Sequence, residues 1–207
     1  MNRLNRDLFF KGFRKYLAAA ISEEKAERIW TEAGEEYDRI LKDQPKLKKH
    51  KGAMVLPAVA LYRAMDAHHA GTEILLKYGE KMGKSFAGMV HKITGVPGVS
   101  RFIWNHVESI ALSMSSEEKG YKRRLVFDPP EMYGVDILSC PYHELAKELG
   151  TEEAALFICR LDKEYTQGFR KIRYERNSAL PEGADCCEYR LRYDEKKELT
   201  ERNRICF

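Results

Sequence analysis

The residues in this chain whose types could do chemistry are concentrated in its second half. A cysteine thiolate is a nucleophile or a metal ligand, and an aspartate can move protons. The residues concerned are Cys140, Cys159, Asp162, Cys186 and Cys187. They are candidates for nucleophilic or metal-assisted chemistry.

Their spacing says more than their number. Cys140 follows an expected strand and precedes an expected helix N-terminus, where backbone N–H groups and the helix dipole favour a thiolate. Cys159 and Asp162 are three residues apart, so they share one helix face. Cys186 and Cys187 are adjacent in an expected strand and must point to opposite sides of the sheet. Only one of this pair can therefore join any given site.

A purely structural role for the cysteines stays open. Free cysteine is among the most buried residue types, and Cys159 in "ALFICRL" has the apolar flanks typical of a core residue. A protein-interaction domain with core thiols is one interpretation. The chain has no Cys-x-x-Cys pair, so a structural zinc site is only weakly indicated. Five cysteines without a signal peptide favour free thiols in a reducing cytoplasm, with Cys206 in a frayed tail.

One histidine and one arginine could assist the thiols. His143 lies three residues after Cys140, in the first turn of the expected helix, where it could act as a base or face water. Arg176 lies on an expected strand, and alternating arginines are typical of a solvent face. An arginine that converges with thiols and carboxylates would instead suit a substrate carboxylate, which guanidinium binds through two hydrogen bonds.

The elements that must position these residues follow from the apolar periodicity. Helical spacing dominates residues 1–118, with Ser22 as the cap of one helix and a nearly all-apolar central helix over 54–68. From Gly120 on, alternating segments predict strands, and the last two read as an antiparallel hairpin joined at "PEG". We predict an α+β fold: a helical N-terminal half followed by a small antiparallel sheet packed against helices. The expected segments of the second half are strands near 121–130, 135–138, 170–180 and 185–195, and helices over 141–149 and 151–169.

Length and composition exclude several classes of protein. The chain has 207 residues, 43% hydrophobic and 33% charged, with a net charge of +4 that indicates no strongly basic partner surface. We expect one domain over 1–207, with a mainly helical region over 1–118, an α+β region over 119–195 and a tail over 196–207. Nothing resembles a nucleic-acid-binding motif, and no apolar run approaches the ~20 residues that a membrane span needs. The expected location is the cytoplasm.

Three segments occur in order and at close spacing: "CPYHELAKELG", "FICRLDKEYTQGF" and "RYERNSALPEGADCCEYR". Together they resemble the L-2-amino-thiazoline-4-carboxylic acid hydrolase family, and "LPAVALYRAM" is similar to its central helix. The likeness covers about residues 50–193. The matching positions are Cys140, Cys159 with Asp162, Arg176, and Gly183 with Cys187.

This resemblance implies hydrolysis of a C–N bond in a small cyclic amidine or carbamoyl compound that carries a carboxylate. The family's usual Cys-Asp-Phe is replaced by Cys187-Glu188-Tyr189, and Cys186 is an addition. The implied catalytic residues are Cys187, Asp162, His143, Cys140 and Cys159. The implied substrate-binding residues are Arg176, Glu188 and Tyr189.

Two mechanisms fit the resemblance. In the first, the Cys187 thiolate attacks the amidine carbon with Asp162 or His143 as base, and no cofactor is required. In the second, Cys140, Cys159 and Cys187 hold a metal ion that activates water. The first is preferred, because no metal-ligand spacing is compelling.

A non-enzymatic function is the alternative. The order of segments is also similar to small cysteine-containing vinyl-reductase-type ligand-binding domains, which are α+β and not all enzymes. A sensor domain that binds a small ligand, a metal ion or an iron–sulfur cluster would use the same cysteines. The expected partner is a small molecule with a carboxylate, and a homo-oligomer stays open.

Overall fold

The computed structural model describes residues 2–128 and 132–197. The chain divides into two compact units, each made of two stretches of sequence. The first contains Met1–Gly79 and Tyr142–Ile158, and the second contains Glu80–Pro141 and Cys159–Phe207. Residues 80–118 of the expected helical region thus belong to the same unit as the later strands. The single-domain interpretation stays a prediction.

The first unit contains α1 (Phe13–Ala20), α2 (Glu23–Asp43), α3 (Leu56–Ala67) and most of α7 (Pro141–Glu148). The expected cap of α2 is confirmed: the Ser22 hydroxyl accepts a hydrogen bond from the backbone N–H of Lys25 at 3.3 Å. Such a side chain satisfies one of the donors that a helix start leaves unpaired.

The core of the first unit is built around α3. Its residues from Leu56 to Leu61 are all buried, as the all-apolar pattern predicts, and Pro57 lies in the first turn. Aromatic rings extend this core, with Phe10 and Phe157 at 4.6 Å between ring centroids. Short 3-10 helices connect the elements at Arg3–Arg6, Pro45–Lys49, Ala53–Val55 and Glu152–Ala155.

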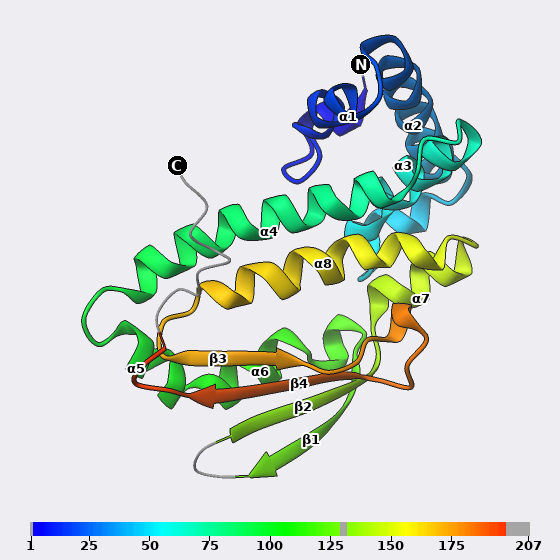
Figure 1. Ribbon diagram of the computed structural model, residues 1–207. Helices are drawn as coiled ribbons and strands as arrows, with labels where there is room; N and C mark the ends of the chain where they lie inside the picture. The colour runs from blue at the N-terminus through cyan, green and yellow to red at the C-terminus, as the bar shows by residue number, and fades with distance from the viewer. Residues whose placement is uncertain (1, 129–131, 198–207) are drawn as a thin grey trace. The chain divides into compact units, whose positions relative to one another are not determined.

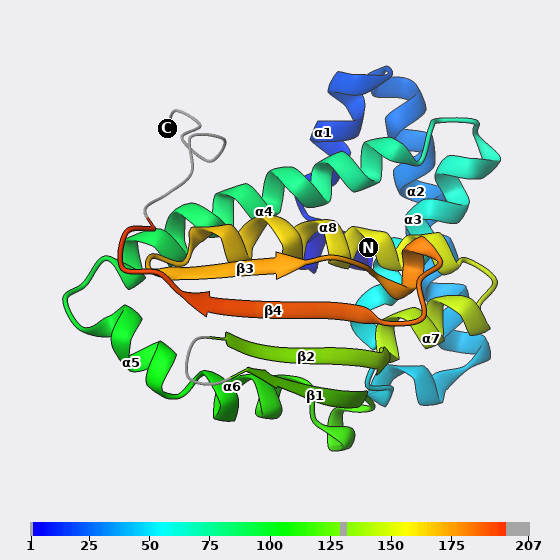
Figure 2. The same ribbon diagram turned by 60° about the horizontal axis from the view of Figure 1, so that its bottom comes forward.

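The second unit places helices against a four-stranded sheet. The helices are α4 (Glu73–Thr94, from Glu80 on), α5 (Val99–Asn105), α6 (Val107–Met114) and α8 (Leu156–Tyr165, from Cys159 on). The strands are β1 (Lys122–Asp128), β2 (Met132–Ser139), β3 (Ile172–Arg176) and β4 (Cys187–Tyr193). Their order is β1-β2-β4-β3 with antiparallel neighbours, which Figure 2 shows. The predicted α+β class, with a helical N-terminal half, is confirmed.

The two faces of this sheet differ in character. Ile137, Val135 and Tyr133 of β2 lie on one face, opposite Cys187, Tyr189 and Leu191 of β4. This face forms an apolar cluster with Trp104, Val107 and Ala111 of α5 and α6. The other face carries the ion pairs of the buried Asp136 with Arg124 (2.7 Å) and Arg190 (2.8 Å). Strand alternation therefore separates a helix-covered face from a charged one.

Helices α4 and α8 run alongside each other (Figure 1). Glycine makes this approach possible, because a Cβ atom at Gly83 would lie 2.5 Å from the carbonyl oxygen of Leu161. At Gly168, just after α8, a Cβ atom would collide with the backbone of Ala87. This close packing fixes the position of α8 beside the sheet.

Two local expectations need correction. Strand β2 begins at Met132, earlier than the expected 135. The last two strands pair antiparallel as predicted, but residues 177–186 join them as a long connection. A 3-10 turn, Leu180–Glu182, takes the place of a tight hairpin turn, and Gly183 adopts a φ of +86° there.

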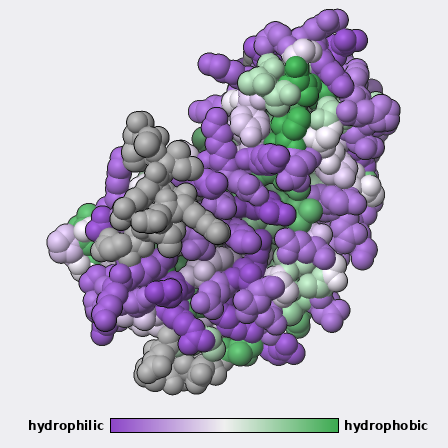
Figure 3. Space-filling view, viewed as in Figure 1, coloured by the Kyte–Doolittle hydropathy of each residue, from purple (hydrophilic) through white to green (hydrophobic). Residues whose placement is uncertain are grey.

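Of the expected tail 196–207, residues 198–207 lie outside the described residues, and Cys206 with them. Lys197 is buried and donates to the backbone carbonyl of Ile172 at 2.6 Å. No helix in the described ranges has the length and apolar character to cross a membrane. Hydrophilic side chains cover most of the face shown in Figure 3.

Candidate functional site

Three elements of the second unit bring the motif residues together. Helix α8 contributes Cys159 and Asp162, β3 contributes Arg176, and β4 contributes Cys187. The Cys159 thiol interacts electrostatically with all of these and with Cys140, which follows β2. We call Cys140, Cys159, Asp162, Arg176 and Cys187 the cysteine–arginine cluster. These are the positions that the motif spacing singled out.

Strand alternation explains why the cluster forms. Ile172, Tyr174 and Arg176 are two residues apart on β3 and share one face. Arg176 lies directly opposite Tyr189 of β4, which shares its face with Cys187. The hydrogen bond between Tyr174 and Asp162, 3.0 Å long, shows that this face points toward α8. The face with the apolar core therefore also carries the polar cluster.

Arg176 has an incomplete set of hydrogen bonds. Its Nη1 atom is buried and has no hydrogen-bond partner within the described residues. Burial alone would lower the pKa of the guanidinium, but the ionisable Cys159, Tyr189 and Tyr174 outweigh it, and the pKa is raised. The arginine therefore stays a cation with an unused donor. In native structures, such donors are rare.

Two thiols of the cluster, those of Cys159 and Cys187, have raised pKa values and are neutral at neutral pH. Burial raises the pKa of Cys159 to about 12, although the charge of Arg176 opposes the shift. Burial raises the pKa of Cys187 only to about 11, because the backbone N–H of Leu180 donates to its sulfur at 3.2 Å and Arg176 lies near. Of the two, Cys187 is the better placed to become a thiolate.

Asp162 is the buried carboxyl group of the cluster. Burial raises the pKa of its carboxyl group, while the hydrogen bond from Tyr174 and the charge of Arg176 lower it. The net direction is upward, which favours the protonated acid. A carboxylic acid kept neutral by its surroundings can donate a proton to a leaving group.

His143 belongs to the first unit. Its Nε2 atom lies 2.7 Å from Glu152 Oε1, and its Nδ1 atom lies 3.8 Å from Glu144 Oε1. Both partners are in the first unit, and the side chain is only 7% exposed. These contacts hold the imidazole in place within the first unit, and the expected role of His143 as a base stays a prediction.

The two residues that flank Cys187 in the sequence lie toward the charged face of the sheet. Glu188 pairs across the sheet with Asp136, on the charged face, and Asn177 donates to it at 3.4 Å. The alternation thus keeps the Glu188 carboxylate away from the cluster. Cys186 is partly buried just before β4, and its thiol lies near Arg124 of the charged face. Tyr189, by contrast, lies on the cluster side.

The described residues offer no group of side chains that could serve as ligands of a metal ion. Among the residues that the structure describes, no group of three or more His, Cys, Asp or Glu side chains is arranged to hold a metal ion. The three cysteines that a metal would need, Cys140, Cys159 and Cys187, do not fit one as they stand. We therefore derive no step through a metal.

Sequence reasoning missed two tyrosines of the site. Tyr174 donates a hydrogen bond to the Asp162 carboxyl group, and the nearby Tyr165 hydroxyl also lowers its pKa. Their positions carried a signal: Tyr165 is three residues after Asp162 on the same helix face, and Tyr174 is two residues before Arg176 on its strand. Phenol hydroxyls therefore lie beside the Asp162 carboxyl group of the cluster.

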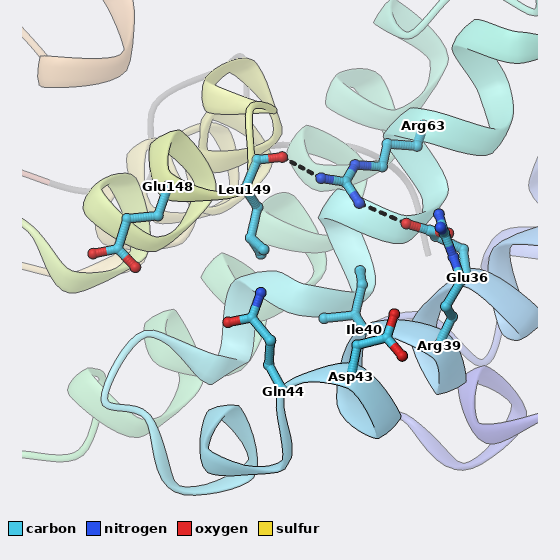
Figure 4. Close-up of a pocket in the computed structure, with 8 residues that line it drawn as sticks. All are labelled: Glu36, Arg39, Ile40, Asp43, Gln44, Arg63, Glu148 and Leu149. Atoms are coloured by element: carbon cyan, nitrogen blue, oxygen red, sulfur yellow. Dashed lines mark hydrogen bonds and ion pairs between the residues drawn. The ribbon is translucent and has the colours of Figure 1, made fainter.

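Arg63 joins the elements that surround a pocket in the first unit. The cavity, of about 270 Å³, lies between α2, α3 and the end of α7 (Figure 4). Arg63 donates to Glu36 at 2.5 Å, to the Thr151 hydroxyl at 3.1 Å and to the backbone carbonyl of Leu149. All of its nitrogens are thus engaged in joining segments of this unit.

Comparisons with known proteins bear on the cluster. A family model described as L-2-amino-thiazoline-4-carboxylic acid hydrolase matches residues 47–191, which contain every residue of the cluster. Neither the curated proteins nor the solved structures gave a match. The family match covers well over half of the chain, and this chain therefore belongs to the L-2-amino-thiazoline-4-carboxylic acid hydrolase family.

Proposed function

We propose that this protein hydrolyses a C–N bond of a small cyclic amidine that carries a carboxylate, such as L-2-amino-thiazoline-4-carboxylate. The observation that carries the proposal is the buried Nη1 of Arg176, which has no partner within the described residues, beside two thiols and a carboxyl group whose pKa is raised. Family membership supplies the class of substrate. The cluster supplies an anchor for its carboxylate, a nucleophile and a proton donor.

Arg176 is the anchor for the substrate carboxylate. A guanidinium binds a carboxylate through two parallel, charge-assisted hydrogen bonds. A bound carboxylate would give Nη1 the acceptor that it lacks, and it would neutralise a charge now surrounded by neutral thiols and phenols. The anchor then holds the amidine carbon beside the thiols of the cluster.

Cys187 is the nucleophile and Asp162 is the proton carrier. The Cys187 sulfur bonds to the amidine carbon while its proton passes to an amidine nitrogen. The C–N bond breaks as Asp162 gives its proton to the leaving nitrogen, which keeps the bonding pair. Water then attacks the same carbon and returns a proton to Asp162. The bond to sulfur breaks, and the Cys187 thiol regains its proton from the attacking oxygen.

A ligand-binding function without catalysis is the second candidate. The specific observation in its favour is that burial raises the pKa of Cys187 to about 11 and that of Cys159 to about 12. Thiols that stay neutral are poor nucleophiles until a substrate changes their surroundings. A carboxylate bound at Arg176 without turnover would be the signature of this candidate.

Incubation of the protein with L-2-amino-thiazoline-4-carboxylate tests both candidates. C–N cleavage releases an amine or ammonia and leaves the ring sulfur bonded to carbon, whereas C–S cleavage releases a free thiol. We expect a new amine or ammonia signal without a new thiol, in wild type and in Cys186→Ser but not in Cys187→Ser. Release of a free thiol would contradict C–N cleavage, and saturable binding without product would favour the ligand-binding function.

A further inference from the structure

Asp162 is surrounded by tyrosine hydroxyls. Tyr174 donates a hydrogen bond to Oδ2 of Asp162 at 3.0 Å. The hydroxyls of Tyr165 and Tyr189 lie near the same carboxyl group and, like that of Tyr174, lower its pKa. Three phenols therefore gather around one buried acid.

Three different elements deliver these hydroxyls. Tyr165 lies one turn after Asp162 on α8, Tyr174 comes from β3 and Tyr189 from β4. The rings of Tyr174 and Tyr189 meet edge to face, 5.6 Å between centroids and at 62°, which fixes both. The backbone carbonyl of Tyr174 also accepts from Gln167 at 3.3 Å. The hydroxyl positions are therefore set by the fold rather than by Asp162.

The phenols act as donors only. Burial raises the pKa values of Tyr174 and Tyr189 well above the usual range, so both keep their protons when Asp162 loses its own. A neutral O–H donor stabilises a carboxylate more than a carboxylic acid. The tyrosines and the charge of Arg176 thus both lower the pKa of Asp162, against the burial that raises it.

We infer that Tyr174 is a positioning residue that holds the Asp162 carboxyl group, through Oδ2, in the orientation for exchanging a proton with the substrate nitrogen. Tyr165 and Tyr189 complete the same support. The inference rests on the proposed function for the identity of the proton acceptor. The hydrogen-bond geometry on which it stands is independent of any substrate.

Tyr174→Phe keeps the ring and removes the hydroxyl. We expect kcat to fall by about 10- to 100-fold with little change in KM, because a general acid contributes about 10²- to 10⁴-fold and only its alignment is lost. The pH at which Asp162 titrates should rise by about one unit, since a donor to the ionised form is gone. The matched control is Tyr193→Phe, which removes a hydroxyl from β4 without touching Asp162.

The titration is read without substrate, from the carboxyl infrared band that wild type has and Asp162→Asn lacks. A midpoint that rises in Tyr174→Phe and not in Tyr193→Phe supports the inference, even if the protein hydrolyses no aminothiazoline. An unchanged midpoint, or a loss confined to KM, overturns it. If Tyr174→Phe does not fold, Tyr165→Phe on α8 undergoes the same two measurements, with the same outcomes.

Discussion

Two arginines of this molecule, one in each unit, differ in how completely their hydrogen-bond donors are used. Arg63 uses every guanidinium nitrogen: Nε on Thr151, Nη1 on Glu36 and Nη2 on the carbonyl of Leu149. Arg176 is also largely covered, yet its buried Nη1 has no partner within the described chain. The first arginine joins elements together, and the second is available to a ligand.

The surroundings of the two arginines sharpen the contrast. Arg63 faces the carboxylate of Glu36, whose pKa is lowered by hydrogen bonds from Arg39 and Arg63 despite its burial. Arg176 faces two thiols, two phenols and the Asp162 carboxyl group, all with raised pKa values. A buried cation without a counter-ion costs stability, and proteins tolerate that cost where a ligand supplies the charge. The following substitutions test whether Arg63 and Arg176 differ in this way.

The largest expected effect is the loss of turnover in Cys187→Ser. Removing a catalytic nucleophile lowers kcat by at least about 10³-fold, while the midpoint of thermal unfolding should stay within about 2 °C, because serine is nearly isosteric. Cys186→Ser, its neighbour near Arg124, should keep wild-type turnover. Equal losses in both variants would remove Cys187 from the site.

The next effect is on substrate binding in Arg176→Met. Losing a charge-assisted pair of hydrogen bonds should raise KM by about 10- to 100-fold, since such bonds contribute about 1.5–3 kcal/mol. The free energy of unfolding should not fall, because no protein acceptor for Nη1 is left behind. A destabilised variant with unchanged KM would make Arg176 a structural residue like Arg63.

The reverse pattern is expected for Arg63→Met. The acceptors on Leu149 and Thr151 lose their donor, which should lower the free energy of unfolding by about 1–2 kcal/mol, measured by urea denaturation. KM should stay unchanged. Arg39→Met is the control, because the exposed guanidinium of Arg39 also pairs with Glu36. This variant should lower the free energy of unfolding by less. A shift in KM in Arg63→Met would show that Arg63 also acts on substrate binding, and it would contradict a purely structural role.

The smallest effect concerns thiol reactivity. The pKa of Cys187 is about 11, so its alkylation by iodoacetamide should accelerate about tenfold per pH unit between pH 7 and 10. Arg176 lowers this pKa, so Arg176→Met should slow alkylation at pH 8 by about threefold, while Arg63→Met should not. A rate that is already constant at pH 8 would show a thiolate and contradict the assigned pKa direction.

The sequence predicts much of this arrangement, because the relevant patterns are local. Ser22 and Pro57 mark helix starts by their own chemistry, and strand alternation by itself separates Cys187 from Cys186. The same alternation places Tyr189 with Cys187 and Glu188 on the other face. The grouping of Glu188 with the site followed the contiguity of a motif, whereas a strand reverses its faces at every residue.

The rest of the site depends on pairing between distant segments. The Arg176 Nη1, which has no partner among the residues that the structure describes, and the hydroxyl of Tyr174 both meet Asp162 and the thiols because β3 lies beside α8. The contact of His143, by contrast, joins residues close in the sequence. Its place three residues after Cys140 suggested a base, which stays a prediction, and its pairing with Glu152 arises through a turn that periodicity does not reveal.

The most direct test of the account is a specificity ratio. It compares kcat/KM for L-2-amino-thiazoline-4-carboxylate with kcat/KM for 2-amino-thiazoline, which lacks the carboxylate, in wild type, Arg176→Met and Arg63→Met. We expect a ratio of about 10- to 100-fold in wild type and in Arg63→Met, and a ratio near one in Arg176→Met. A ratio that survives in Arg176→Met would contradict the assignment of Arg176 as the carboxylate anchor.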